Sequence, residues 1–219
     1  MSDQTEHGPL AAVLRDAAAG RFPPPNGDVT VLPPPSPRDS GVLGFTAHAV
    51  VFTDADPAWV RARLPDDDPS RPLSPAFLQA LGAHTYREAH IIDMLCVASS
   101  RSGQPGMTLR PEPDVAHPRI ARAMRYRDDV RAWRTNGGLV LIGRGVASRW
   151  EVAIEVDPGY RGNGLGRALA SAARHLVPDH APVWAQIAPA NAASVRAFLA
   201  AGFRPAGAEA LLTHSELGV

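Results

Sequence analysis

A glycine-rich turn late in the chain has the residue types best suited to bind a ligand. It consists of Arg161, Gly162, Asn163, Gly164, Leu165 and Gly166, and Arg167 follows. Glycines remove side chains where a ligand must approach the backbone, and free amides at the start of a helix bind anions such as a pyrophosphate. Arg161 and Arg167 add positive charge. The pattern predicts a phosphate-binding turn.

Other folds use a similar turn, so its context has to be considered. A dinucleotide-binding fold places the turn after the first strand of a βαβ unit, with an acidic residue about twenty positions later, whereas here it follows a predicted hairpin. An ATP-binding phosphate loop needs a lysine after the glycines, and all 22 basic residues of this chain are arginine. A turn that binds no ligand remains a minor alternative.

The elements around the turn follow from hydrophobic periodicity and turn residues. Residues 150–156 alternate as a strand and place Glu151 and Glu155 on one face. Asn136-Gly137 between two apolar runs predicts a hairpin. The predicted helices are 10–19, 59–64, 75–81, 116–126, 165–176 and one from Asn191 to Gly202. The predicted strands are 41–52, 91–98, 130–133, 139–142, 150–156, 183–187 and 203–212.

Two motifs together resemble the GCN5-related N-acetyltransferase (GNAT) family. Residues 161–166, preceded by Val-Asp-Pro at 156–158, are similar to the family's Arg/Gln-x-x-Gly-x-Gly/Ala turn. Residues 191–194, Phe198 and the Gly-Phe step at 202–203 look like its downstream helix. The resemblance covers residues 129–213 well and 41–128 loosely, and it leaves out the first forty residues.

The resemblance implies an α/β (α+β) fold with a mixed, mostly antiparallel central sheet flanked by helices. The sheet is splayed between its fourth and fifth strands, here residues 150–156 and 183–187, and the pantetheine arm of the cofactor fills the gap by pairing with backbone. We expect a proline-rich, partly flexible N-terminal arm at 1–40 and an acetyltransferase domain at 41–219. Its acceptor-side half is 41–128 and its acetyl-CoA-binding half is 129–213.

The resemblance also implies the chemistry. An amine of a small molecule or protein would attack acetyl-CoA directly in a ternary complex. No metal is expected. The candidate bases are Glu151 and Glu155, although the face of a strand also carries glutamates in plain salt bridges. The residues expected to hold the cofactor are Ile154, Val156, Arg161, Gly162, Asn163, Gly164, Leu165, Gly166, Arg167, Asn191, Ser194 and Phe198.

Phe198 leaves a second hypothesis open. Family members often carry a tyrosine at this position, which protonates the departing thiolate, and phenylalanine has no proton to donate. The alternative is therefore a catalytically weak or inactive CoA-binding or regulatory protein with the same fold.

Composition limits the partners. Positive and negative side chains balance at 22 each, so no global field attracts nucleic acid or an anionic membrane. No run approaches the length of a membrane-spanning helix, and we expect a cytoplasmic protein. The single cysteine, Cys96, lies in an apolar run and is predicted to be buried. A last strand at 203–212 would form an exposed edge through which a homodimer could pair.

Overall fold

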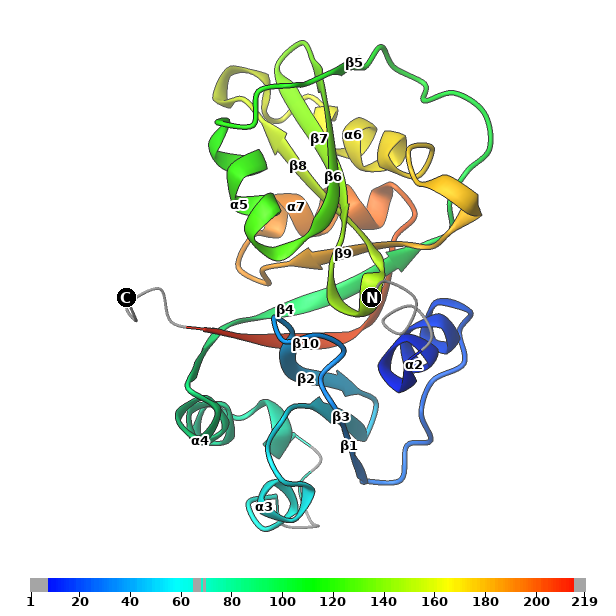
Figure 1. Ribbon diagram of the computed structural model, residues 1–219. Coiled ribbons are helices and arrows are strands. Elements are labelled where there is room, and N and C mark those ends of the chain that lie inside the picture. Colours follow the sequence, from blue (N-terminus) through cyan, green and yellow to red (C-terminus); the bar gives the residue numbers. More distant parts are fainter. Residues whose placement is uncertain (1–7, 65–67, 69, 215–219) are drawn as a thin grey trace. The chain divides into compact units, whose positions relative to one another are not determined.

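The computed structural model describes residues 8–64, 68 and 70–214 (Figure 1). The chain divides into two compact units. Unit 1 contains the described residues up to Met94 and those from Ala206 onward, and unit 2 is Leu95–Pro205. Strands β4 (Arg87–Ala98) and β10 (Arg204–His214) each contribute residues to both units.

Unit 1 has a mixed sheet. Besides β4 and β10, its strands are β1 (Val29–Leu32), β2 (Ser40–Phe45) and β3 (His48–Phe52). They lie in the order β1, β3, β2, β10, β4; β1 pairs with β3 in parallel, and β2 pairs antiparallel with both β3 and β10. The other elements of the unit are α2 (Pro9–Ala18), α3 (Pro57–Arg61), the 3-10 turn Arg71–Leu73 and α4 (Pro75–Thr85).

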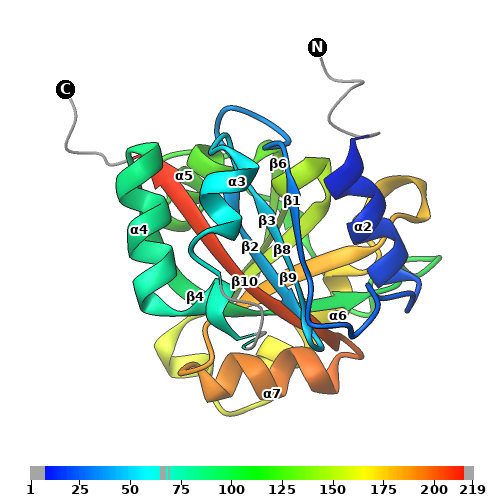
Figure 2. The ribbon, with the colours of Figure 1, turned by 90° about the horizontal axis from the view of Figure 1, so that it is seen from below.

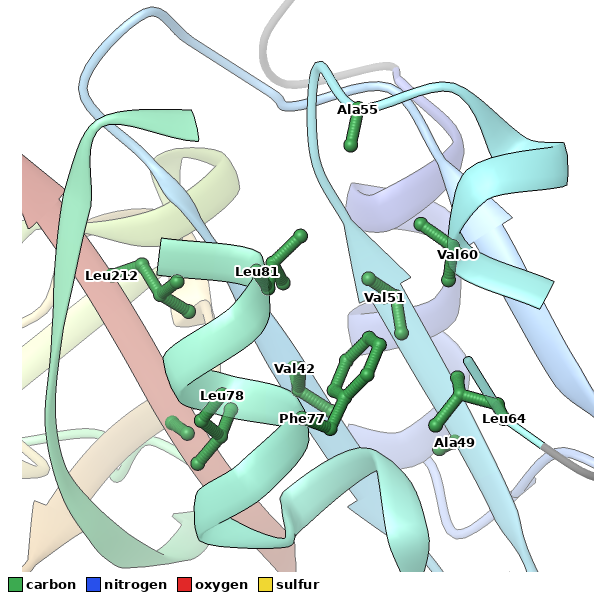
Figure 3. Packing of buried hydrophobic residues seen from close by; sticks show 11 residues of the cluster. Val42, Ala49, Val51, Ala55, Val60, Leu64, Phe77, Leu78, Leu81 and Leu212 are labelled. Atoms are coloured by element: carbon green, nitrogen blue, oxygen red, sulfur yellow. The ribbon is translucent and has the colours of Figure 1, made fainter. Parts of the chain in front are cut away.

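The core of unit 1 lies between this sheet and helices α3 and α4. Phe77, Leu78 and Leu81 of α4 pack against Val42 and Val51 of the strands, as Figure 3 shows. Asp56 begins α3 by accepting hydrogen bonds from the amides of the first turn. Helix α2 lies on the other side of the strands (Figures 2 and 3).

Two predictions for unit 1 are wrong, and a third stays a prediction. The strand predicted at 41–52 is wrong, because the backbone turns back at Ala47 (φ 47°) and forms the β2–β3 hairpin. The last strand is not an edge, since β10 lies between β2 and β4. Within the expected arm at 1–40, the helix predicted at 10–19 is confirmed as α2, with Leu10 and Leu14 buried, and β1 joins the sheet. The division into arm and domain stays a prediction.

Unit 2 contains the glycine turn. Besides β4, its strands are β5 (Arg110–Pro111), β6 (Asp128–Thr135), β7 (Gly138–Arg144), β8 (Trp150–Val156) and β9 (Val183–Ile187). They lie in the order β4, β9, β8, β7, β6, β5; β6 to β8 form an antiparallel meander, and β9 runs parallel to β8. The helices are α5 (Pro118–Tyr126), α6 (Leu165–Ala173) and α7 (Ala192–Ala200), and 3-10 turns lie at Val146–Ser148, Pro158–Tyr160 and Pro178–His180.

Helices cover both faces of the meander (Figure 1). Ile120 and Ala123 of α5 pack with Leu139, Leu141 and Ala153 on one face. Helix α6 packs on the other face, toward which the alternate residues Ile154 and Val156 of β8 point. The predicted mixed, mostly antiparallel sheet flanked by helices is thereby confirmed, as are the strands at 150–156 and 183–187 and the hairpin turn at Asn136-Gly137.

Among the described residues, no helix is long and apolar enough to cross a membrane. The cytoplasmic location and the homodimer stay predictions.

Candidate functional site

Strands β8 and β9 pair only where they begin. Trp150 lies opposite Val183 and Glu151 opposite Trp184, and no further pair follows in the described part of the chain. Burial along β8 changes near the same place: residues 150–152 are buried, and residues 153–156 are half-buried. We call these segments the closed end and the open end of β8. The predicted splay between the fourth and fifth strands is therefore present.

The glycine turn follows the open end directly. Gly162 and Gly164 adopt left-handed backbone conformations, with φ of 82° and 81°. A Cβ atom added at either position would meet no atom within 4 Å, so the space above the turn is open. Gly164 is the N-cap of the nine-residue helix α6 and has no side chain to cap it, which leaves the first amides of the helix available to an anion.

The charged residues of the turn are exposed. Arg161 donates a hydrogen bond from Nε to the carbonyl oxygen of Val156 at 3.1 Å, so its stem lies back along the strand. Arg167 is exposed on the first turn of α6. The side chains of Ile154 and Val156 lie near Gly166, on the face of β8 that α6 covers.

Helix α7 has the geometry expected from its motif. The Oδ1 atom of Asn191 accepts a hydrogen bond from the amide of Ser194 at 3.1 Å and caps the helix. Phe198 is 4% exposed, and its ring packs edge-on against Phe203 with centroids 5.0 Å apart. Phe198 is therefore a core residue. The resemblance places a proton donor at this position in other family members.

Glu151 lies at the closed end and is only 3% exposed. Its Oε2 atom accepts from Arg127 Nε at 2.7 Å, and its Oε1 atom accepts from Arg149 Nε at 2.9 Å. Burial alone would raise the pKa of this carboxyl, but the charges and hydrogen bonds of the two arginines outweigh it, so the pKa is lowered from its ordinary value. A carboxylate held in this way is a poor proton acceptor.

Arg127 also crosses the splay. Besides Glu151 on β8, its guanidinium reaches Gln186 on β9, with Nη2 3.3 Å from Oε1. Gln186 lies two residues beyond the last paired residue of β9, Trp184. One side chain, 12% exposed, therefore contacts both strands at the point where they separate.

Glu155 lies at the open end in different surroundings. Its Oε2 atom is 2.8 Å from Nε of Arg119 on α5, and the two side chains are 37% and 41% exposed. Both predicted carboxylates thus face the α5 side of the sheet, as the alternation along the strand requires, and each is paired with an arginine from α5 or from the residue after it.

Tyr160 connects the glycine turn to the β6–β7 hairpin. Its hydroxyl donates to Asn136 Oδ1 at 3.0 Å, and its ring lies on Gly137, where an added Cβ would come 2.1 Å from the ring. The amide of Asp157 donates to the carbonyl of Gly137 at 2.9 Å. The hairpin turn therefore supports the residues that lead into the glycine turn.

Five side chains of this region were not predicted from the sequence: Arg119, Arg127, Arg149, Gln186 and Tyr160. The sequence does contain a signal for the arginines, because a glutamate in an apolar strand needs a cationic partner when it is buried. It does not indicate which of 22 basic residues that partner is. Tyr160 precedes the turn directly, and its contact with Gly137 depends on how the hairpin folds.

Neither a metal-binding cluster nor a reactive thiol is found among the described residues. Among the described residues, no group of three or more His, Cys, Asp or Glu side chains is placed to hold a metal ion. Cys96 is buried as predicted, and burial raises the pKa of its thiol to about 11, which disfavours the reactive thiolate.

The splayed strands and the glycine turn have the arrangement that the resemblance implied. Residues 130–203 match the model of the acetyltransferase (GNAT) family, so this segment is similar to that family.

Two solved structures are similar to the chain. A GCN5-related N-acetyltransferase from Kribbella flavida is 16% identical over 62% of this chain and 63% of its own, with a TM-score of 0.41. An acetyltransferase from the GNAT family from Colwellia psychrerythraea is 10% identical over 63% of this chain and 61% of its own, with a TM-score of 0.40. The match spans less than two thirds of either relative, and such TM-scores support no inference about this chain. No curated protein matches it.

Proposed function

We propose that the protein is an acetyl-CoA-dependent N-acetyltransferase that transfers the acetyl group to an amine of a small molecule or a protein. The observation that carries the proposal is the splay of β8 from β9 immediately before an uncapped glycine turn. The first feature exposes strand backbone for pairing, and the second exposes amides for a pyrophosphate. Both lie within the segment that matches the family model.

The residues of the site fit the cofactor. The backbone of Ile154 and Val156 lies at the open end, where a pantetheine arm can add to the strand. The space above Gly162 and Gly164 is open to a pyrophosphate, and the exposed Arg161 and Arg167 add positive charge around it, leaving residues 191–198 of α7 for the lower arm. Acetyl-CoA supplies an activated acyl group as a thioester.

The transfer needs a base, and we assign this role to Glu155 in preference to Glu151. The acceptor's ammonium group must lose a proton, its nitrogen forms the bond to the acetyl carbon, and the carbon–sulfur bond breaks as CoA leaves as a thiolate. Glu151 is buried between two guanidinium groups, whereas Glu155 is half-exposed and forms an ion pair with Arg119. Solvent protonates the thiolate, because Phe198 has no proton to give.

A second candidate function is favoured by the same side chains. Both carboxylates of β8 are ion-paired, and Phe198 is packed in the core. A protein that binds CoA and transfers nothing would tolerate all three features. The two functions share the cofactor site and differ only in turnover.

Binding is tested first, by isothermal titration calorimetry with acetyl-CoA and with CoA. The diagnostic variant is Gly164→Glu, which adds a negative side chain over the turn. Its matched control is Gly103→Glu, because Gly103 has a similar left-handed φ (82° against 81°) and the same open surroundings in another loop of unit 2. Micromolar binding that is lost in the first variant and kept in the second supports the site. No binding by the wild type would refute it.

Turnover separates the two candidates. Release of free thiol from acetyl-CoA is followed with a panel of amines, with Glu155→Gln beside the wild type. For the transferase we expect a drop in kcat of roughly 100-fold or more, the usual contribution of a general base, with unchanged affinity for acetyl-CoA. Tight binding without thiol release for any amine would favour the CoA-binding protein.

A further inference from the structure

The Arg119–Glu155 pair is the exchangeable charge pair beside the proposed reaction centre. Its atoms are in direct contact, yet more than a third of each side chain is exposed. Exposed pairs of this kind contribute little to stability, so opening the pair costs little. Arg127 and Arg149, by contrast, are 12% and 4% exposed and hold the buried Glu151, a pair that is expensive to break.

The backbone that carries the exchangeable pair is firmly placed. Helix α5 is anchored next to Arg119 by Ile120, which is buried against the strands. Glu155 lies in register with the buried Leu139 of β7. The two charged groups therefore stay within reach of one another and of the open end of β8 even when their side chains rotate apart.

Proton transfer from the acceptor removes the charge balance of this pair. At neutral pH an amine acceptor is an ammonium ion, and a carboxylate can accept from an ammonium and a guanidinium together. Once Glu155 takes the proton it is neutral and no longer balances the charge of Arg119. The guanidinium of Arg119 is then left facing the site without its counter-ion. A guanidinium is a planar fork of donors that matches a carboxylate, and such charge-assisted pairs are among the stronger hydrogen bonds.

We infer that the acceptor carries a carboxylate beside its amine, as a free α-amino acid does, with the ammonium on Glu155 and the carboxylate on Arg119. This inference rests on the proposed transferase function. An acceptor of this class replaces one protein ion pair with two protein–ligand ion pairs. An amine without a carboxylate neutralises Glu155 in the same way and leaves Arg119 uncompensated, so it is the poorer acceptor.

The test compares acceptors that differ only in the carboxylate. Each of the common amino acids is assayed for acetyl-CoA-dependent thiol release beside its carboxamide, for example L-phenylalanine beside L-phenylalaninamide. The amine of a carboxamide is less basic and more often unprotonated, so unassisted chemistry favours the amide. For the best amino acid we expect kcat/KM to exceed that of its amide by roughly 10- to 100-fold, the value of a hydrogen bond to a charged group.

The variant Arg119→Met shows whether the guanidinium causes the preference. It should lower kcat/KM for the amino acid and leave that for the amide unchanged or raise it, because no uncompensated guanidinium remains. The ratio is then abolished. The control is Arg122→Met on the same helix, an exposed arginine that stacks on Tyr126 and should keep the ratio. The unfolding midpoint of each variant is measured to confirm that it folds.

The outcomes distinguish the inference from the function beneath it. Amides or simple amines that react as well as amino acids overturn the inference and leave the transferase standing, as does a ratio that survives Arg119→Met. Binding of acetyl-CoA with no thiol release for any acceptor refutes the transferase and the inference with it. Calorimetric titration of the CoA complex with the best amino acid gives a second readout, and Arg119→Met should weaken this binding about tenfold or more.

Discussion

The two ends of strand β8 carry the same acidic residue in opposite surroundings. At the closed end β8 is paired on both edges, by β7 and by β9, and Glu151 is buried between Arg127 and Arg149. At the open end β8 is paired with β7 alone, and Glu155 forms a partly exposed ion pair with Arg119. Two glutamates only four positions apart on one strand thus differ in role: Glu151 is a buried structural carboxylate, and Glu155 is a partly exposed one that can change its partner.

The comparison teaches that residue type and strand face do not determine the role of a carboxylate here. Alternation puts both glutamates on the side of α5, and each has an arginine partner. What differs is the strand pairing, because β9 pairs with β8 at Trp150 and Glu151 and not at the end that carries Glu155. The most direct ways to break the comparison are substitutions that act on one end at a time.

The largest effect is expected from Glu151→Gln. Removing the charge leaves Arg127 and Arg149 buried without their anion, and the loss of one partner of a buried pair costs about 3–5 kcal/mol. The free energy of unfolding at pH 7 should fall by that amount, as measured in urea. The matched variant is Glu155→Gln on the same strand, which should cost about 1 kcal/mol or less. Equal losses in the two variants would contradict the difference between the ends.

The same difference should depend on pH in one direction. The pKa of Glu151 is lowered in the folded protein, so its stabilising contribution is complete above the ordinary glutamate pKa, near 4.5, and is lost as the pH falls through the lower folded value. The gap in unfolding free energy between the wild type and Glu151→Gln should therefore be constant from pH 7 to about 5 and shrink below about 4.5. A gap that widened on acidification would show that the carboxyl is not held as an anion.

Much of unit 2 could be predicted from the sequence because its signals are local. The strand at 150–156 follows from its alternation and the strand at 183–187 from a short run of mostly apolar residues. Asn-Gly marks the hairpin, and Asn191 caps α7. Each of these depends on the chain within a few residues. Phe198 in the core is likewise consistent with its spacing on the helix.

The remainder depends on contacts that no local pattern specifies. The β2–β3 hairpin turns at Thr46-Ala47, which lacks the glycine or asparagine that marks such turns, so a single strand was predicted there. The position of β10 between β2 and β4 joins residues more than a hundred apart in the chain. The pairing of Arg127 with Glu151 is a third case. Every arginine in the sequence has the same charge, so the sequence does not show which of them contacts this glutamate.

A smaller effect should come from Gly137→Ala, which tests how the open end is supported. The new Cβ would fall on the ring of Tyr160, and the left-handed φ of 75° adds strain. We expect a loss of roughly 1–3 kcal/mol in unfolding free energy. Because the displaced ring also moves the start of the glycine turn, the affinity for CoA should fall about tenfold.

A double variant separates strain from contact at this site. Tyr160→Ala with Gly137→Ala removes the ring that the new Cβ strikes, so part of the lost stability should return. The cycle of the two single variants and the double variant gives the coupling between the residues. Additive losses would show that Tyr160 does not position the turn through Gly137.

The smallest effect is expected from Gln186→Ala, which removes the contact of Arg127 with β9 and keeps that with Glu151. The bond is long, at 3.3 Å, and Gln186 is half-buried, so the free energy of unfolding should fall by only about 1 kcal/mol. If Arg127 sets how far the strands separate, the KM for acetyl-CoA should rise severalfold while kcat changes little. A loss of stability as large as that of Glu151→Gln would mean that the contact of Arg127 with Gln186 on β9 matters as much as its pair with Glu151 on β8. The burial of Glu151 would then not explain the stability of the closed end.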